Sequence, residues 1–195
     1  MTEHVDKARL ETDLFYRFEY LSKFFYFNSY DIECLNRIFI HIHPRLSVFV
    51  DTIYRKLFTF DITKQYFFLR HSDFQHTISS NDQYHFSFHC EQLEFRKNML
   101  TEYLKRIFTD QHWNESSVKY LSSVGQIHTS QAGSKIIHVD YFHLNALLGF
   151  IAQNLIDLIM KLNEIDEQLK YSSVLAVNKV FWIQNDFFRM HFNKI

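Results

Sequence analysis

The chain has 195 residues, a formal net charge of -1, and only three glycines and one proline. This length suits one well-filled domain over 1–195, and the absence of a basic stripe argues against a nucleic-acid partner. Because short strands joined by tight turns need glycine and proline, their scarcity predicts an all-α chain of long helices.

The first part of the chain predicts three helices. Apolar residues recur at helical spacing over Leu10–Phe25, which predicts one amphipathic N-terminal helix. A second helix is expected after Asn28, a residue type that caps helices well. Pro44 predicts the start of a third helix, because proline is tolerated in the first helical turn, and Val50 and Tyr54 share one face of that helix.

The remainder predicts one irregular connection and four further helices. Residues 72–90 are polar and aperiodic, so we expect an irregular segment there. Apolar residues at a 3.6-residue period predict helices over Gln92–Thr109, Glu115–His128, 138–163 and 167–192, with a loop at 129–135. No repeat or low-complexity tract divides the chain.

Several absences favour a cytoplasmic protein. The most apolar run, Leu144–Met160, is interrupted by amide and acidic side chains, so we expect a buried helix and no membrane span. The N-terminus lacks the apolar core of a signal peptide. Cys34 and Cys90 have neither disulfide-framework nor metal-site spacing, which suits a reducing compartment.

His128 is the strongest candidate for a chemical role. Leu121, Val124 and His128 lie at positions i, i+3 and i+7 of one helix face, so the histidine is expected to face inward. One interpretation is a core histidine that bonds to a backbone carbonyl, and the other is a ligand. His85, His89 and Cys90 have helical spacing for a metal site, but no further ligand completes a recognisable set.

Several segments together resemble one family of proteins. The run Val124-Gly125-Gln126-Ile127-His128, followed by a long helix and then by 176–188, is similar to protoglobins and to the globin domains of globin-coupled sensors. Supporting segments lie at 17–21, 50–54 and 103–108, so the resemblance covers nearly the whole chain. The C-terminal segment resembles the stand-alone eukaryotic members in particular.

The resemblance implies a globin fold, a 3-over-3 helical sandwich, with an extra N-terminal helix and a haem b. It implies that His128 is the iron ligand, with its second nitrogen oriented by a carbonyl one turn back, such as that of Val124. Gly125 is expected to leave room for the porphyrin. The bacterial sensor pattern has Ile-Gly-Leu-x-Pro after the histidine, whereas this chain has 129–133 as Thr-Ser-Gln-Ala-Gly, which indicates a different loop.

The family places a tyrosine on the opposite face of the haem, and Tyr54 matches it by position. Its hydroxyl would donate a hydrogen bond to a bound gas, or alternatively Tyr54 only packs in the core. Further pocket candidates, for each of which core packing is the alternative, are Ile53, Leu100, Tyr103, Leu104, Leu144, Leu147 and Ile151. His138 and His143 are the alternative iron ligands.

The function implied is reversible binding of O₂, CO or NO, for sensing, storage or transport. A homodimer through the last two helices is implied by analogy with sensor globins. Two other classes stay open. One is a haem-free globin-fold interaction module, and the other is a haem enzyme with NO dioxygenase or peroxidase-like activity, for which the chain offers no reductase segment.

Overall fold

The computed structural model describes residues 2–67, 91–129 and 139–192. Regular structure in these ranges is entirely helical, which confirms the all-α expectation. The α-helices are α1 Lys7–Thr12, α2 Leu14–Phe25, α3 Ser29–Ile42, α4 Leu46–Leu57, α5 Asp61–Lys64, α6 Glu91–Thr109, α7 Glu115–Gln126, α8 Tyr141–Met160 and α9 Glu167–Phe192. Two 3-10 turns, His43–Arg45 and Gln65–Phe67, adjoin α4 and α5.

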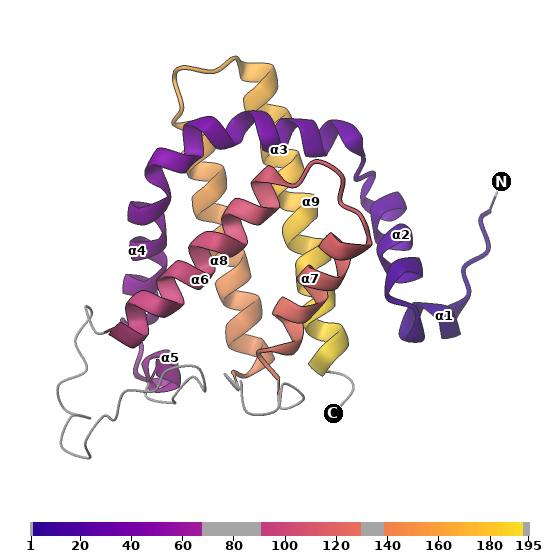
Figure 1. Cartoon of the computed structure of the whole chain (residues 1–195), viewed down its shortest axis with the longest axis horizontal. Helices are drawn as coiled ribbons and strands as arrows, with labels where there is room; N and C mark the ends of the chain where they lie inside the picture. The colour runs from indigo at the N-terminus through magenta and orange to yellow at the C-terminus, as the bar shows by residue number, and fades with distance from the viewer. Residues whose placement is uncertain (1, 68–90, 130–138, 193–195) are drawn as a thin grey trace.

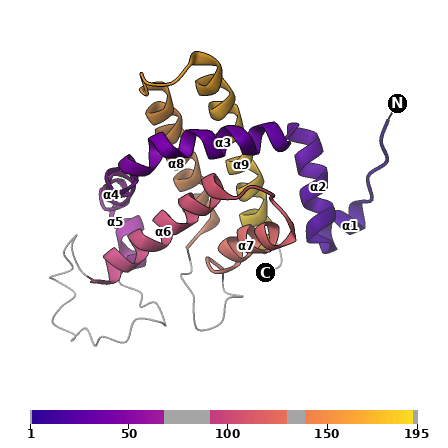
Figure 2. The same ribbon diagram turned by 45° about the horizontal axis from the view of Figure 1, so that its top comes forward.

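The helices pack in two crossed layers. The long helices α8 and α9 lie side by side, and α3 crosses both of them (Figure 1). In front of this pair, α6 crosses α8 and α7 packs along α9. The turned view in Figure 2 places α4 at one end of α3 and α2 at the other.

The N-terminal segment forms two helices, so the prediction of one continuous helix over Leu10–Phe25 is wrong. Asp13 has an extended backbone, with φ of -109° and ψ of 104°, and its carboxylate accepts hydrogen bonds from the N–H groups of Phe15 and Tyr16. It therefore ends α1 and caps α2. Behind the break, Arg17 Nη2 donates to Asp186 of α9 at 2.7 Å and ties α2 to the main body.

Other predicted boundaries hold to within a few residues. Asn28 caps α3 in a capping box with Asp31, and 167–192 is helical throughout. Pro44 lies in a 3-10 turn, so α4 begins just after it, at Leu46. The helix expected to end at His128 ends at Gln126, and the histidine follows in a turn. The connections expected at 72–90 and at 130–135 lie outside the described residues.

Helix α8 is long and apolar enough, on length and composition alone, to cross a membrane. Core helices of globular proteins often have this character. Here the inner side of α8 is buried against α9, α3 and α4 through Leu144, Leu148, Ile151, Leu155 and Ile159. Its outer side leaves Phe142 and Met160 more than half exposed.

Candidate functional site

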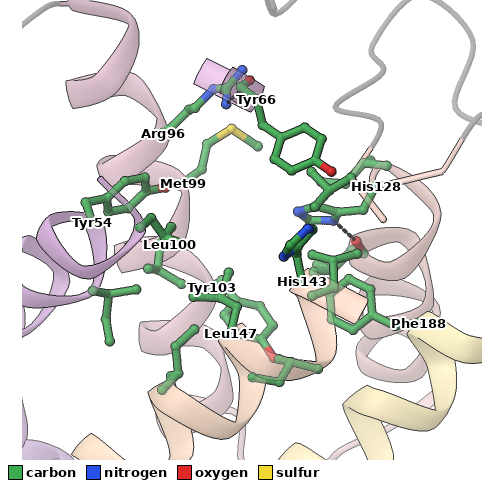
Figure 3. Close-up of a pocket in the computed structure, with 18 of the residues that line it drawn as sticks. Tyr54, Tyr66, Arg96, Met99, Leu100, Tyr103, His128, His143, Leu147 and Phe188 are labelled. Carbon is green, nitrogen blue, oxygen red and sulfur yellow. Dashed lines mark hydrogen bonds between the residues drawn. The ribbon is translucent and has the colours of Figure 1, made fainter. Parts of the chain in front are cut away.

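A cavity of about 360 Å³ lies between the helices (Figure 3). Its size is within the range of small-molecule and cofactor sites. We call the side formed by α4 and α6 the tyrosine wall; it contributes Ile53, Tyr54, Leu57, Arg96, Met99, Leu100 and Tyr103. We call the side formed by α7, its C-terminal turn and α9 the histidine wall; it contributes Tyr120, Ser123, Val124, Ile127, His128 and Phe188. Helix α8 closes the space with His143, Leu144, Leu147, Leu148 and Ile151, and further lining comes from Thr63, Tyr66, Phe67 and Val139.

His128 is held in one orientation at the C-terminal end of α7. Its Nδ1 donates a hydrogen bond to the Val124 carbonyl at 2.8 Å, the partner expected from the sequence. The ring packs edge-on against Phe188, with ring centres 5.3 Å apart. Because Nδ1 carries the proton, Nε2 keeps its lone pair, and no described residue donates to it. The ring lies at the edge of the cavity, opposite Tyr54 (Figure 3).

The surroundings keep this histidine neutral. Burial lowers the pKa of His128 to about 4, the hydrogen bond to Val124 opposes that shift, and the positive charge of Arg96 adds to it. A neutral imidazole with an oriented ring is the form that binds a transition metal. The geometry therefore suits a metal ligand better than a core histidine satisfied by a carbonyl alone.

Tyr54 faces the cavity from the tyrosine wall. It is 8% exposed, and its ring packs edge-on against Phe67 at 5.7 Å. Burial raises the pKa of its phenol, and Arg96 partly opposes this shift, so the hydroxyl stays protonated at any ordinary pH. That hydroxyl makes no hydrogen bond within the described ranges. A protonated donor thus stands across the cavity from His128.

A polar network anchors the histidine wall from behind. Tyr103 donates to Gln184 Oε1 at 3.3 Å, and Gln184 Nε2 donates to the Leu121 carbonyl of α7 at 3.0 Å. Farther along, Ser122 Oγ and His191 Nε2 lie 2.9 Å apart. Gln184 and His191 both belong to α9 and are buried. Helix α7, which precedes His128, is therefore fixed to α9 by hydrogen bonds as well as by packing.

The structure brings most of the predicted pocket residues to the cavity, but not Leu104 and Gly125. Leu104 is fully buried in the core. Gly125 faces α9, where an added Cβ would lie 3.0 Å from the Phe187 carbonyl oxygen and 3.1 Å from the His191 ring. The glycine therefore makes room for α9, whereas the sequence suggested room for a porphyrin.

Arg96 is the functional candidate that sequence reasoning missed. It lines the cavity although it is only 5% exposed. Arg96 lies one turn before Leu100 and two turns before Tyr103 on α6. This spacing, which places all three on one helix face, was the signal available in the sequence. A search for apolar periodicity passes over a charged residue in such a stripe.

His143 is less well placed than His128 for a ligand role. His143 lines the cavity beside His128, but its ring packs on Tyr66, with centres 5.9 Å apart, and no carbonyl of a described residue orients it. His138, His85, His89 and Cys90 lie outside the described ranges. Within those ranges, no cluster of three or more histidine, cysteine or acidic side chains could hold a metal ion.

Comparisons with known proteins bear on the family and the fold. The family model described as Protoglobin matches residues 15–194. Among solved structures, the globin domain of a Geobacter sulfurreducens globin-coupled sensor is similar, with a TM-score of 0.67 and 14% identity over 89% of this chain and 96% of that one. This similarity confirms the expected globin fold. No curated protein matches the chain in sequence.

Proposed function

Since the chain belongs to the protoglobin family, we propose that it holds a haem b in the cavity, with His128 as iron ligand, and reversibly binds O₂, CO or NO. The observation that carries the proposal is the orientation of His128. Its Nδ1 is committed to the Val124 carbonyl, so the available nitrogen is Nε2, on a ring that lines the cavity.

The residues present fit this cofactor. The cavity lining is mainly aliphatic and aromatic, as a flat apolar macrocycle requires. A bound haem would supply an iron that binds a diatomic gas. From this chain, His128 would hold the iron, the apolar lining would exclude water, and the Tyr54 hydroxyl would donate to the gas. The biological use is sensing, storage or transport.

Titration of the purified protein with haemin tests the proposal. We expect a Soret band that saturates at one haem per chain, and a shift of that band when CO is added to the reduced protein. Absence of a Soret band after reconstitution would contradict the proposal and favour the haem-free interaction module. Turnover of NO or peroxide would indicate a haem enzyme.

We also propose a homodimer through α8 and α9. Their outer sides expose a set of large apolar residues, Phe142, Met160, Tyr171, Leu175 and Trp182. Exposed apolar area of this kind is typical of a surface covered by a partner. At Gly149 of α8, nothing lies within 4 Å of an added Cβ, so this surface is open to a second copy. We expect a dimer in sedimentation analysis and a monomer for Trp182→Glu; an unchanged mass would contradict this interface.

We propose the cytoplasm as the compartment. Cys34 is a buried free thiol, and such thiols persist in reducing surroundings. Fractionation of cells that express the tagged chain would test this, and recovery with membranes would overturn it.

A further inference from the structure

Two buried tyrosines of the tyrosine wall line the cavity, and they differ in how their hydroxyls are bonded. Tyr54 is 8% exposed and Tyr103 is 6% exposed. Burial raises the pKa of both phenols, so each hydroxyl keeps its proton at ordinary pH. Figure 3 shows the Tyr54 hydroxyl pointing into the space between the walls and the Tyr103 hydroxyl pointing to the lower edge of the view. Both are potential donors, but they face different surroundings.

The Tyr103 hydroxyl is bonded to the amide of Gln184, a fully buried residue of α9. Gln184 Nε2 donates to the Leu121 carbonyl at 3.0 Å, and because a carbonyl can only accept, this bond fixes which end of the amide is the donor. The other end, Oε1, lies 3.3 Å from the Tyr103 hydroxyl and can only accept from it. The amide orientation that Leu121 selects therefore makes Tyr103 the donor in this pair.

This bond occupies the only proton that the Tyr103 phenol has. To donate to a gas in the cavity, Tyr103 would first have to release Gln184, and exchange of one hydrogen bond for another gains little. The release would also leave Oε1 of a fully buried amide without this donor, which is unfavourable. Tyr54 has no such bond to give up within the described ranges, so it donates at lower cost.

We propose that Gln184 determines which tyrosine serves the gas, because it retains the proton of Tyr103 and leaves Tyr54 as the donor of the tyrosine wall. This inference rests on the proposed function. Gln184 does not line the cavity, so it is a positioning residue that acts through Tyr103. Replacement of Gln184 by a residue without an acceptor should make the Tyr103 hydroxyl a second donor to the gas.

The bond itself is tested in the full-length chain without haem. Gln184→Met keeps the approximate length of the side chain and removes both of its hydrogen bonds, whereas Tyr103→Phe removes the hydroxyl alone. Denaturant unfolding of the two single variants and the double variant should show a coupling of roughly twofold to tenfold in the unfolding equilibrium constant. Gln184→Leu replaces the methionine variant if that variant does not fold. Additive effects would overturn the inference, whether or not the chain binds haem.

Gas dissociation from the haem-loaded protein tests the consequence. In a Tyr54→Phe background, Gln184→Met should slow O₂ dissociation roughly twofold to tenfold, because the Tyr103 hydroxyl becomes available as a donor. Tyr103→Phe, added as a third substitution, should abolish this slowing. The C–O stretching band of the CO complex should move to lower frequency with Gln184→Met and return with Tyr103→Phe. Absence of both changes would overturn the inference while leaving haem binding intact.

Ser122→Ala is the matched control, because the contact of Ser122 Oγ with His191 Nε2 also joins α7 to α9 but includes no tyrosine. In the Tyr54→Phe background it should not slow O₂ dissociation, and slowing equal to that of Gln184→Met would overturn the inference in favour of a general loosening of α9. Gln184→Glu should behave as wild type, since a protonated carboxyl can accept from Tyr103 and donate to Leu121. Failure of wild type to bind any haem would overturn the proposed function itself.

Discussion

The two walls of the cavity are built in different ways. On the histidine wall, the ring of His128 is fixed by Val124, and α7 is bonded to α9 through Gln184 and His191. On the tyrosine wall, Tyr54 is held by burial and by its contact with Phe67, and its hydroxyl has no partner in the described part of the chain. The histidine wall is thus held in place by hydrogen bonds within the protein. The tyrosine wall presents an unbonded donor, the Tyr54 hydroxyl.

The difference between the walls matches two tasks, ligation of a metal and recognition of a small ligand. A metal ligand has to keep one orientation, which hydrogen bonds from a rigid helix provide. A donor that recognises a small ligand has to be unbonded before that ligand arrives, because exchange of one hydrogen bond for another gains little. The contrast predicts that substitutions on the histidine wall affect cofactor retention and stability, while Tyr54 affects the choice of gas.

The largest expected effect is that of His128→Ala. Loss of the iron ligand should speed haem release on the order of a hundredfold. Each factor of ten in this rate corresponds to about 1.4 kcal/mol. Added imidazole should restore the reduced and CO-bound spectra by filling the vacated space. Unchanged spectra without imidazole would show that another residue ligates the iron, and His143→Ala and His138→Ala would then be compared.

Gly125→Ala should weaken the attachment of the histidine wall to α9. The added methyl would lie 3.0 Å from the Phe187 carbonyl oxygen, a backbone atom that cannot turn aside. Overpacking of this kind costs about 1 to 3 kcal/mol of unfolding free energy, measured by denaturant titration of the apoprotein.

Gly149→Ala is the matched control, because nothing lies within 4 Å of its added Cβ. It should stabilise the protein by roughly 0.5 to 1 kcal/mol through better helix propensity. Equal changes in unfolding free energy for the two variants would indicate that the close approach of α9 to Gly125 does not affect stability.

The last expected effect concerns the gas alone: Tyr54→Phe removes the donor and keeps the ring. Loss of a hydrogen bond worth about 1 to 2 kcal/mol should speed O₂ dissociation roughly fivefold to thirtyfold. CO is a weaker acceptor, so its dissociation should change less. Tyr103→Phe should have little effect on either gas, because that hydroxyl already donates to Gln184. Equal changes for both gases in Tyr54→Phe would assign Tyr54 to packing or access.

Helix positions followed well from local sequence. Asn28 lies directly before α3, and the apolar period of α9 lies within that helix. Each signal is therefore local to the helix that it predicts. The break at Asp13 was missed because one extended residue barely disturbs the apolar period over Leu10–Phe25. The end of α7 was misplaced by two residues, since no glycine or proline follows Gln126 before Gly133.

Tertiary neighbours were harder to predict. Gly125 has the same local pattern whether it faces a cavity or a helix, and only the path of α9 decides between them. Arg96 was overlooked because its place at the cavity depends on how α6 packs with other helices. His128 and Tyr54 were expected to face inward from their spacing, and both line the cavity. The role that the resemblance implied for each stays a prediction.

The position of α9 in the packing has a consequence for the order of events during synthesis. This helix contacts α3, α7 and α8, and it receives Arg17 of α2 across 169 residues of sequence. Of the described helices it leaves the ribosome last. Earlier helices would expose the apolar faces that α9 later covers, and contacts of such long range slow folding. A nascent chain stalled before Glu167 should therefore bind chaperones and fail to fold until α9 is supplied.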